Sequence, residues 1–250
     1  MSIYMASPLP QTISPPWLSE PARAAVFAAL AEAGFEARAV GGAVRNALLG
    51  LPVVEVDMAT TAKPDQVIAA AEKAGLKAIP TGLAHGTVTV VADGVATEVT
   101  TLREDVETHG RHARVAFTDD WAADARRRDF TMNALYCDAQ GRLFDPLEGY
   151  GDLLARRVRF IGEARMRIRE DYLRILRFFR FNAQYGEGDL DGPSLAACIA
   201  EREGLRVLSG ERVQQELRKL LAAPRAGAMV EALIDAGLLV AILGRAPQLR

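Results

Sequence analysis

Cysteine is scarce in this sequence, which has only Cys137 and Cys198 among its 250 residues. Two cysteines make neither a disulfide framework nor a zinc site, so the composition fits a reducing, cytoplasmic environment. Histidine is scarce too, and His85, His109 and His112 lack metal-ligand spacing with the cysteines. We therefore expect no metal site built on cysteine and histidine.

Long hydrophobic runs are also missing. No apolar run approaches the roughly 20 residues that a membrane-spanning helix needs. Residues 1–16 have neither a cationic start nor a sustained apolar stretch. We therefore expect neither a membrane span nor a secretory signal.

Charge is distributed unevenly along the chain. The formal net charge of −2 does not by itself indicate nucleic-acid binding. Residues 126–182, however, carry 13 arginines against 8 acidic residues, whereas residues 1–125 carry 9 basic against 15 acidic residues. This pattern is compatible with carboxylate chemistry beside a phosphate-binding surface, although solvated helix faces would produce it as well.

Periodicity and capping signals outline two regions. Helices are predicted at residues 19–34, 43–49, 64–74, 167–185 and 211–221, and strands at 37–40, 53–58, 86–92 and 95–101. Asp93-Gly94 joins the last two strands as a hairpin turn. Residues 102–120 are charged with little periodicity, which predicts a mobile loop. Strands disappear after about residue 150, so we expect an α+β region followed by a helical one.

A Gly-Gly pair follows the first predicted strand. Glycine at positions 41 and 42 would let backbone N–H groups approach an anion closely. Arg45, one turn into the following helix, could reach the same phosphates. A tight turn without a ligand is the alternative and the commoner role of such a pair.

Two carboxylates flank Val56 on a predicted strand. Glu55 and Asp57 would project from the same face and could hold two Mg²⁺ ions, one activating a hydroxyl and one bridging a triphosphate. Glu98 of the predicted hairpin is a candidate third carboxylate. The alternative is a solvated strand face.

Arginine and aspartate recur together in two later motifs. Arg128 is a candidate phosphate clamp, with Asp129 orienting it or binding ribose, and a charge pair at a helix start is the alternative. Asp171, Arg174, Arg177 and Arg180 follow one another at intervals of three residues, which places them on one helix surface.

The second of these motifs has the chemistry to read a base. An aspartate accepts from an exocyclic amine while an arginine donates to a ring acceptor, so cytosine and adenine fit and uracil and guanine do not. Such a site would need no nucleic-acid template. A structural Asp–Arg pair is the alternative.

Together these motifs resemble those of the bacterial class II tRNA nucleotidyltransferases, the CCA-adding enzymes, and their poly(A) polymerase relatives. The resemblance covers residues 35–222 and depends on the stretches 41–45, 55–61, 127–135, 145–153, 170–174 and 211–221. It implies a polymerase-β-like head with a mixed sheet over residues 1–150, which is catalytic. An all-helical neck that recognises the base would follow over 151–225, and a helical body would begin over 226–250. Because family members are usually much longer, we expect this chain to be a head-and-neck portion.

The resemblance also implies a reaction and its residues. A tRNA 3′-hydroxyl would attack the α-phosphate of ATP or CTP and release pyrophosphate. Glu55 and Asp57 would hold Mg²⁺, and Glu98 completes the candidate catalytic set. The candidate nucleotide-binding residues are Gly41, Gly42, Arg45, Arg128, Asp129, Asp171, Arg174, Arg177 and Arg180.

Two positions depart from the family pattern. Glu55 stands where aspartate is usual, and it keeps the charge but reaches one methylene further. Asn46 stands where aspartate is common after the arginine.

CCA addition is the leading hypothesis among several. A poly(A) polymerase shares every motif, and CTP use separates the two. An enzyme that adds only CC or only A is a third variant, which the segment at 102–120 could influence. A homologue that binds tRNA ends without catalysis is the remaining alternative, and Glu55 motivates it.

Overall fold

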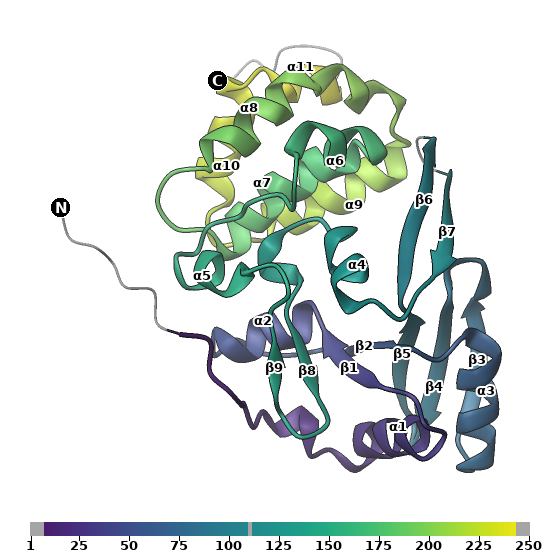
Figure 1. Ribbon diagram of the computed structural model, residues 1–250. Helices are drawn as coiled ribbons and strands as arrows, with labels where there is room; N and C mark the ends of the chain where they lie inside the picture. Colours follow the sequence, from purple (N-terminus) through teal and green to yellow (C-terminus); the bar gives the residue numbers. More distant parts are fainter. Residues whose placement is uncertain (1–7, 110–111, 244–250) are drawn as a thin grey trace. The chain divides into compact units, whose positions relative to one another are not determined.

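The computed structural model describes residues 8–109 and 112–243. The chain divides into two compact units (Figure 1). The sheet unit consists of residues 1–107 and 114–151, and the helical unit consists of residues 108–113 and 152–250. Each unit is described by itself below.

A mixed seven-stranded sheet is the framework of the sheet unit. Its strand order is β3-β4-β5-β2-β1-β8-β9, and β2 and β5 run parallel while the other neighbours are antiparallel. The strands are β1 (Ala37–Val40), β2 (Asp57–Thr60), β3 (Lys77–Gly82), β4 (Thr87–Ala92), β5 (Val95–Thr101), β8 (Tyr136–Asp138) and β9 (Leu143–Phe144). The prediction of an α+β fold with a mixed sheet is confirmed.

The two faces of this sheet differ in chemistry. Met58, Val88 and Val99 are almost fully buried and share one face. Helices α1 (Pro21–Glu32) and α3 (Pro64–Lys73) pack on β4 and on each other (Figure 1). The residues next to these in sequence point to the opposite face because side chains alternate along a strand. That opposite face therefore carries Asp57 and Glu98.

Several elements of the sheet unit match their predictions. The hairpin of β4 and β5 turns at Asp93 and Gly94, whose φ values of 47° and 79° suit the two-residue turn predicted for this pair. Helices α1 and α3, helix α2 (Gly42–Leu48) and strand β1 lie within two residues of their predicted bounds. Strands β3, β8 and β9 were not predicted.

Two predictions for this unit are wrong. The strand predicted at 53–58 begins only at Asp57, and residues 51–56 are irregular. The loop predicted at 102–120 instead contains β6 (Arg103–His109) and β7 (His112–Phe117) and ends just before α4 (Trp121–Arg126). Strands β6 and β7 form a separate two-stranded sheet. The charged sequence of β6 lacks the apolar alternation that predicts a strand, whereas Ala113, Val115 and Phe117 alternate along β7 and were a signal for it. Residues 110–111 of that loop lie outside the described residues.

The helical unit is built around α7 (Leu173–Tyr185), which contacts α9 and α10. Its core side chains include Ile175, Leu176, Phe178 and Phe179, all fully buried. The other helices are α6 (Ala164–Glu170), α8 (Gly192–Ala200), α9 (Gly210–Leu221), α10 (Ala226–Asp235) and α11 (Leu238–Leu243), with α5 (Gly149–Leu154) at the boundary and the 3₁₀-helix η4 (Arg202–Val207) before α9. The helix predicted at 211–221 is confirmed as α9. Residues 244–250, the end of the predicted body segment, lie outside the described residues.

The prediction of a single helix at 167–185 is wrong, because the helix is interrupted at Asp171. Helix α6 ends at Glu170, and Asp171 has extended φ and ψ values of −154° and 106°. Its Oδ1 then accepts a hydrogen bond of 3.1 Å from the backbone nitrogen of Leu173. Aspartate side chains compete for backbone donors and favour such helix ends over helix interiors. Asp171 therefore lies before α7, whereas Arg174 and Arg177 lie on it.

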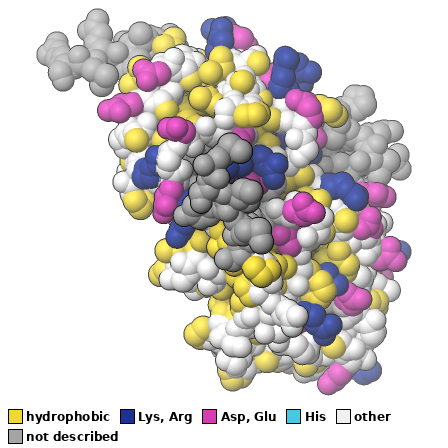
Figure 2. Space-filling view, turned by 60° about the vertical axis from the view of Figure 1, so that its left-hand side comes forward, with side chains coloured by type: hydrophobic (Ala, Val, Ile, Leu, Met, Phe, Trp, Pro, Cys, Tyr) yellow, Lys and Arg dark blue, Asp and Glu magenta, His cyan; other side chains and the backbone are white. Residues whose placement is uncertain are grey.

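Acidic and basic side chains are interspersed on the face drawn in Figure 2. Part of the arginine excess in residues 126–182 is engaged in local ion pairs. Arg165 and Arg169 both reach Glu201, with N–O distances of 2.9 and 2.8 Å. These two arginines fit the solvated-helix interpretation of the charge pattern. Among the described residues no helix is long and apolar enough to cross a membrane.

Candidate active site

Three carboxylates line one pocket of about 270 Å³ in the sheet unit. They are Glu55, Asp57 and Glu98. Met58 lies opposite Val99 in the parallel pair of β2 and β5, so Asp57 lies beside Glu98 on the same face of the sheet. Glu55 comes from the irregular segment before β2. The structure thus brings together all three carboxylates that the sequence predicts.

The electrostatics of this pocket favour a cation. The pKa of Asp57 is raised, first by burial and then by the negative charges of Glu98 and Glu55. The positive charge of Arg128 opposes this shift. Carboxylates that repel one another in this way are relieved when a cation lies between them.

The residues of this pocket fit a magnesium ion that is shared with a substrate. Among the residues whose side chains the structure describes, 8–104 and 116–243, no three side chains of His, Cys, Asp or Glu are grouped so as to hold a metal ion by themselves. Mg²⁺ in nucleotide enzymes is commonly held by one or two carboxylates together with substrate phosphates and waters. Glu55 and Asp57 suit that partial role.

The Gly-Gly turn lies at the same end of the sheet as the carboxylates. Val40, the last residue of β1, pairs with Asp57, the first residue of β2. Gly41 follows with φ 68° and ψ −117°, a conformation that is open to glycine. A Cβ atom there would lie 3.9 Å from Nη1 of Arg128. The predicted phosphate turn and the predicted phosphate clamp therefore face each other.

Arg45 is buried behind this turn, with 6% of its surface exposed. Its Nη1 donates to Oδ1 of Asn133 at 2.5 Å, and Nδ2 of Asn133 donates to Oδ1 of Asp129 at 2.9 Å. A Cβ atom on Gly42 would lie 3.7 Å from Nη2 of Arg45. Arg45 thus supports the turn from inside, and its contact with a triphosphate stays a prediction.

Arg128 is held by two residues that the sequence did not single out. Its Nη2 donates to Oδ2 of Asp124 at 2.8 Å, and its Nε donates to the hydroxyl of Tyr136 at 3.2 Å. The hydroxyl of Tyr136 donates in turn to Asp124 at 3.0 Å. Burial alone would lower the pKa of Arg128, but Tyr136 and Asp124 raise it above its usual range. Arg128 therefore stays charged and fixed.

Asp124 also pairs with Arg127, at 2.8 Å, and only 1% of its side chain is exposed. Burial favours its neutral form, but the charges of Arg128 and Arg127 outweigh that effect and lower its pKa. Its spacing from the two arginines, three and four residues on, was the signal that could have identified it.

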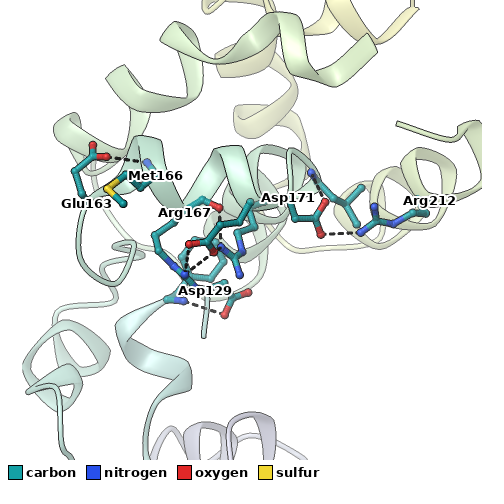
Figure 3. Close-up of polar contacts among 10 residues, drawn as sticks. Asp129, Glu163, Met166, Arg167, Asp171 and Arg212 are labelled. Atoms are coloured by element: carbon teal, nitrogen blue, oxygen red, sulfur yellow. Dashed lines mark hydrogen bonds and ion pairs between the residues drawn. The ribbon is translucent and has the colours of Figure 1, made fainter. Parts of the chain in front are cut away.

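In the helical unit, α9 supplies partners to the predicted base-reading residues. Arg212 lies with Nη2 2.7 Å from Oδ2 of Asp171 (Figure 3). One turn later, Glu216 lies 2.6 Å from Nε of Arg180 and 3.8 Å from Nη1 of Arg177. Neither Arg212 nor Glu216 was predicted.

Arg174, on α7, is held by residues of α6, which lies before the helix interruption at Asp171. Its Nη1 lies 2.5 Å from Oε2 of Glu170 and donates to the backbone oxygen of Arg167 at 2.6 Å. Glu170 and Arg167 also form an ion pair with each other. Asp171 and Arg174 therefore do not share one helix surface, as was predicted. Arg174 is held by residues of α6, whereas Asp171 is held by Arg212 of α9.

Comparison with known proteins places the fold and the motifs in one family. Residues 37–159 match the family model described as the poly(A) polymerase head domain. Residues 189–250 match the model described as a probable RNA- and SrmB-binding site of polymerase A.

Individual relatives agree with these matches. A mitochondrial CCA tRNA nucleotidyltransferase 1 of Danio rerio is 45% identical over 207 residues, which are 82% of this chain and 48% of the relative. A CCA-adding enzyme of Geobacillus thermodenitrificans is 44% identical over 207 residues, 82% of this chain and 50% of the relative. The chain therefore spans about half the length of the curated relatives it matches.

A solved structure shows the same fold. The Bacillus stearothermophilus CCA-adding enzyme in complex with CTP superposes with a TM-score of 0.83 at 36% identity, and the match covers 94% of this chain and 55% of that one. Together with the matches above, this shows that the chain belongs to the family of class II CCA-adding enzymes and poly(A) polymerase heads.

Proposed function

We propose that this chain is the catalytic part of a template-independent tRNA nucleotidyltransferase, which adds C and A to the tRNA 3′ end. The observation that supports it most is the pocket that gathers Glu55, Asp57 and Glu98. The Gly41 turn and Arg128 lie next to each other at this end of the same sheet. The relatives that match at 44–45% identity carry the names CCA tRNA nucleotidyltransferase and CCA-adding enzyme.

In this proposal the sheet unit performs the chemistry. Glu55 and Asp57 would hold Mg²⁺, which when bound would supply activation of the attacking hydroxyl and positive charge for the triphosphate. Backbone N–H groups at Gly41 and Gly42, together with Arg128, bind the phosphates and align them with the carboxylates. The tRNA 3′-oxygen then forms a bond to the α-phosphorus of ATP or CTP as the bond to pyrophosphate breaks.

The helical unit selects the base. Asp171 accepts from the exocyclic amine that cytosine and adenine share, and Arg174 donates to the adjoining ring acceptor. Arg212, Glu170 and Glu216 hold the reading side chains through the ion pairs described above. A preset donor–acceptor pattern of this kind rejects uracil and guanine because their pattern is reversed.

The poly(A) polymerase alternative stays open because both matching family models are named for that enzyme. The catalytically silent homologue stays open because Glu55 stands where the family usually has aspartate. The segment at 102–120 is the place to look for a determinant of CC-only or A-only activity. For the compartment, we propose a reducing one, which agrees with both cysteines being free and buried.

The deciding experiment is incorporation of labelled CTP, ATP and UTP, with Mg²⁺, into tRNA that lacks its 3′-CCA. We expect addition of C and then A, refusal of UTP, and no turnover by the Asp57→Asn variant. Repeated addition of A alone to any RNA end would favour the poly(A) polymerase. Nucleotide binding without turnover, even after Glu55→Asp, would favour the silent homologue.

A second experiment tests base reading alone. Arg174→Ala should lose discrimination of CTP against UTP while its dependence on Mg²⁺ stays close to that of the wild type. Unchanged selectivity in this variant would contradict the role given to Arg174.

A further inference from the structure

One side chain ties the segment before β2 to helix α2. Nδ2 of Asn46 donates to the backbone oxygen of Pro52 at 2.8 Å. Oδ1 of Asn46 accepts from Nε and Nη2 of Arg45 at 3.1 and 2.9 Å. The backbone oxygen of Asn46 also accepts from the nitrogen of Leu51 at 2.8 Å. Asn46 thus links a buried arginine to the segment 51–56.

Packing alone does not fix that segment. Val54 is 84% exposed, and Leu51, Pro52 and Glu55 are exposed as well. Val56, at 3% exposure, is its buried anchor. A stretch with so little buried surface depends on hydrogen bonds for a defined path.

The two metal-binding candidates differ in how they are held. Asp57 belongs to β2 and is fixed by pairing with Val40 of β1. Glu55 lies in the irregular segment, so its carboxylate reaches the acidic pocket only when the path of residues 51–56 is correct. The bond from Asn46 to Pro52 lies at the other end of that path.

We propose that Asn46 is a positioning residue for Glu55: its amide holds the segment 51–56 so that the Glu55 carboxylate stays beside Asp57. This inference rests on the proposed function, in which Glu55 holds Mg²⁺. An aspartate at position 46 would accept from Arg45 but could not donate to the oxygen of Pro52.

The hydrogen bond from Asn46 to Pro52, called the tether below, can be tested without metal or turnover. We would measure ¹⁵N order parameters of the Val53 and Val54 amides in the metal-free protein. They should be near 0.8 in the wild type and fall toward roughly 0.6 in Asn46→Asp. Gln66→Glu is the matched control, since it makes the same amide-to-carboxylate change where the side-chain oxygen only accepts, from the nitrogen of Lys63. Equal order parameters in the wild type and Asn46→Asp would overturn the tether.

The link to Glu55 is tested by the Mg²⁺ concentration that gives half-maximal turnover. Loss of one hydrogen bond in Asn46→Asp should raise this Mg²⁺ concentration about fivefold, with little change in the turnover rate at saturating Mg²⁺. Added negative charge alone would lower it, and Gln66→Glu should not change it. In a Glu55→Asp background, Asn46→Asp should add less than it does alone. A lowered or unchanged value in Asn46→Asp overturns the proposal, whereas absence of turnover in the wild type overturns the proposed function and leaves the order parameters to decide the tether.

Discussion

Arg212 and Asp171 form an ion pair of 2.7 Å between residues 41 positions apart in the sequence. While Oδ2 of Asp171 accepts from Arg212, Oδ1 accepts from the backbone nitrogen of Leu173. Both oxygens are therefore engaged, and the plane of the carboxylate is fixed. A carboxylate held in one orientation accepts only from a donor at one position on the base. A carboxylate that rotates freely could also accept from a donor at another position, so fixing it favours discrimination between bases.

Replacing Arg212 should therefore weaken base selection more than chemistry. In Arg212→Leu we expect discrimination of CTP against UTP to fall roughly fivefold to tenfold, since a hydrogen bond to a charged group is worth about 1.5 kcal/mol. The measurement is kcat/KM for each nucleotide, with kcat at saturating CTP as the comparison. Arg206→Leu, which removes an exposed arginine paired with Glu203, is the control and should leave selectivity unchanged. A proportional loss with both nucleotides would contradict this role.

Asp124→Asn should destabilise the protein in a pH-dependent way. The pKa of Asp124 is lowered in the folded state by Arg128 and Arg127, against the effect of burial. Its ionised form therefore contributes stability that is present above its unfolded pKa, near 3.9, and is lost as the pH falls through the lower folded pKa. We expect a loss of about 3 kcal/mol at pH 7, because a buried charge pair is broken.

The check is the free energy of unfolding of the wild type and Asp124→Asn between pH 2 and pH 7. The two curves should converge at the acidic end. Asp120→Asn on the same helix changes an exposed capping residue whose side chain accepts from the nitrogen of Ala122. It should cost about 1 kcal/mol or less. Curves that stay parallel down to pH 2 would show that ionisation of Asp124 does not stabilise the fold.

Local sequence signals predicted the parts of the site that depend on neighbours in the chain. The turn at Gly41 was predicted because a Gly-Gly pair after a strand is a local feature. The grouping of Glu55 with Asp57 was predicted from strand alternation, although Glu55 reaches the pocket from the irregular segment before β2. The break at Asp171 was missed because helix periodicity continues on both sides of it. Arg212 and Glu216 were missed because their partnership with Asp171 and Arg180 is created by packing of α9 on α7, and no spacing rule reaches so far.

Asp57→Asn should stabilise the metal-free protein while it abolishes turnover. Burial and the neighbouring Glu98 and Glu55 raise the pKa of Asp57 in the folded state. Its ionisation then opposes folding, so stability falls as the pH rises from the usual pKa of aspartate through the raised value. Asparagine does not ionise, so the Asp57→Asn variant is spared this loss of stability. Because Asp57 is exposed to solvent, which screens this repulsion, we expect a slightly higher Tm than the wild type at pH 7 without Mg²⁺, and a smaller rise in Tm when Mg²⁺ is added.

Asp65→Asn is the control for this change. Asp65 is an exposed residue in the first turn of α3, and its loss should leave the response to Mg²⁺ intact. A lower Tm for Asp57→Asn in the absence of metal would mean that its carboxylate makes a favourable contact in the folded protein, against the repulsion described above.

Gly41→Ala should cost stability that Gly42→Ala does not. Gly41 has φ 68° and ψ −117°, which an L-residue adopts only with a strain of about 1–3 kcal/mol. Gly42 is already helical, and a Cβ atom there would lie 3.7 Å from Nη2 of Arg45, an ordinary contact. In chemical denaturation we expect Gly41→Ala to lose about 2 kcal/mol and Gly42→Ala to stay within about 0.5 kcal/mol of the wild type. The methyl group added at Gly41 lies beside Arg128, where the triphosphate is proposed to approach, so Gly41→Ala should raise the KM for CTP. The methyl group added at Gly42 faces the buried Arg45, so Gly42→Ala should change the KM less. An unchanged KM in Gly41→Ala would contradict close contact between the phosphates and this turn.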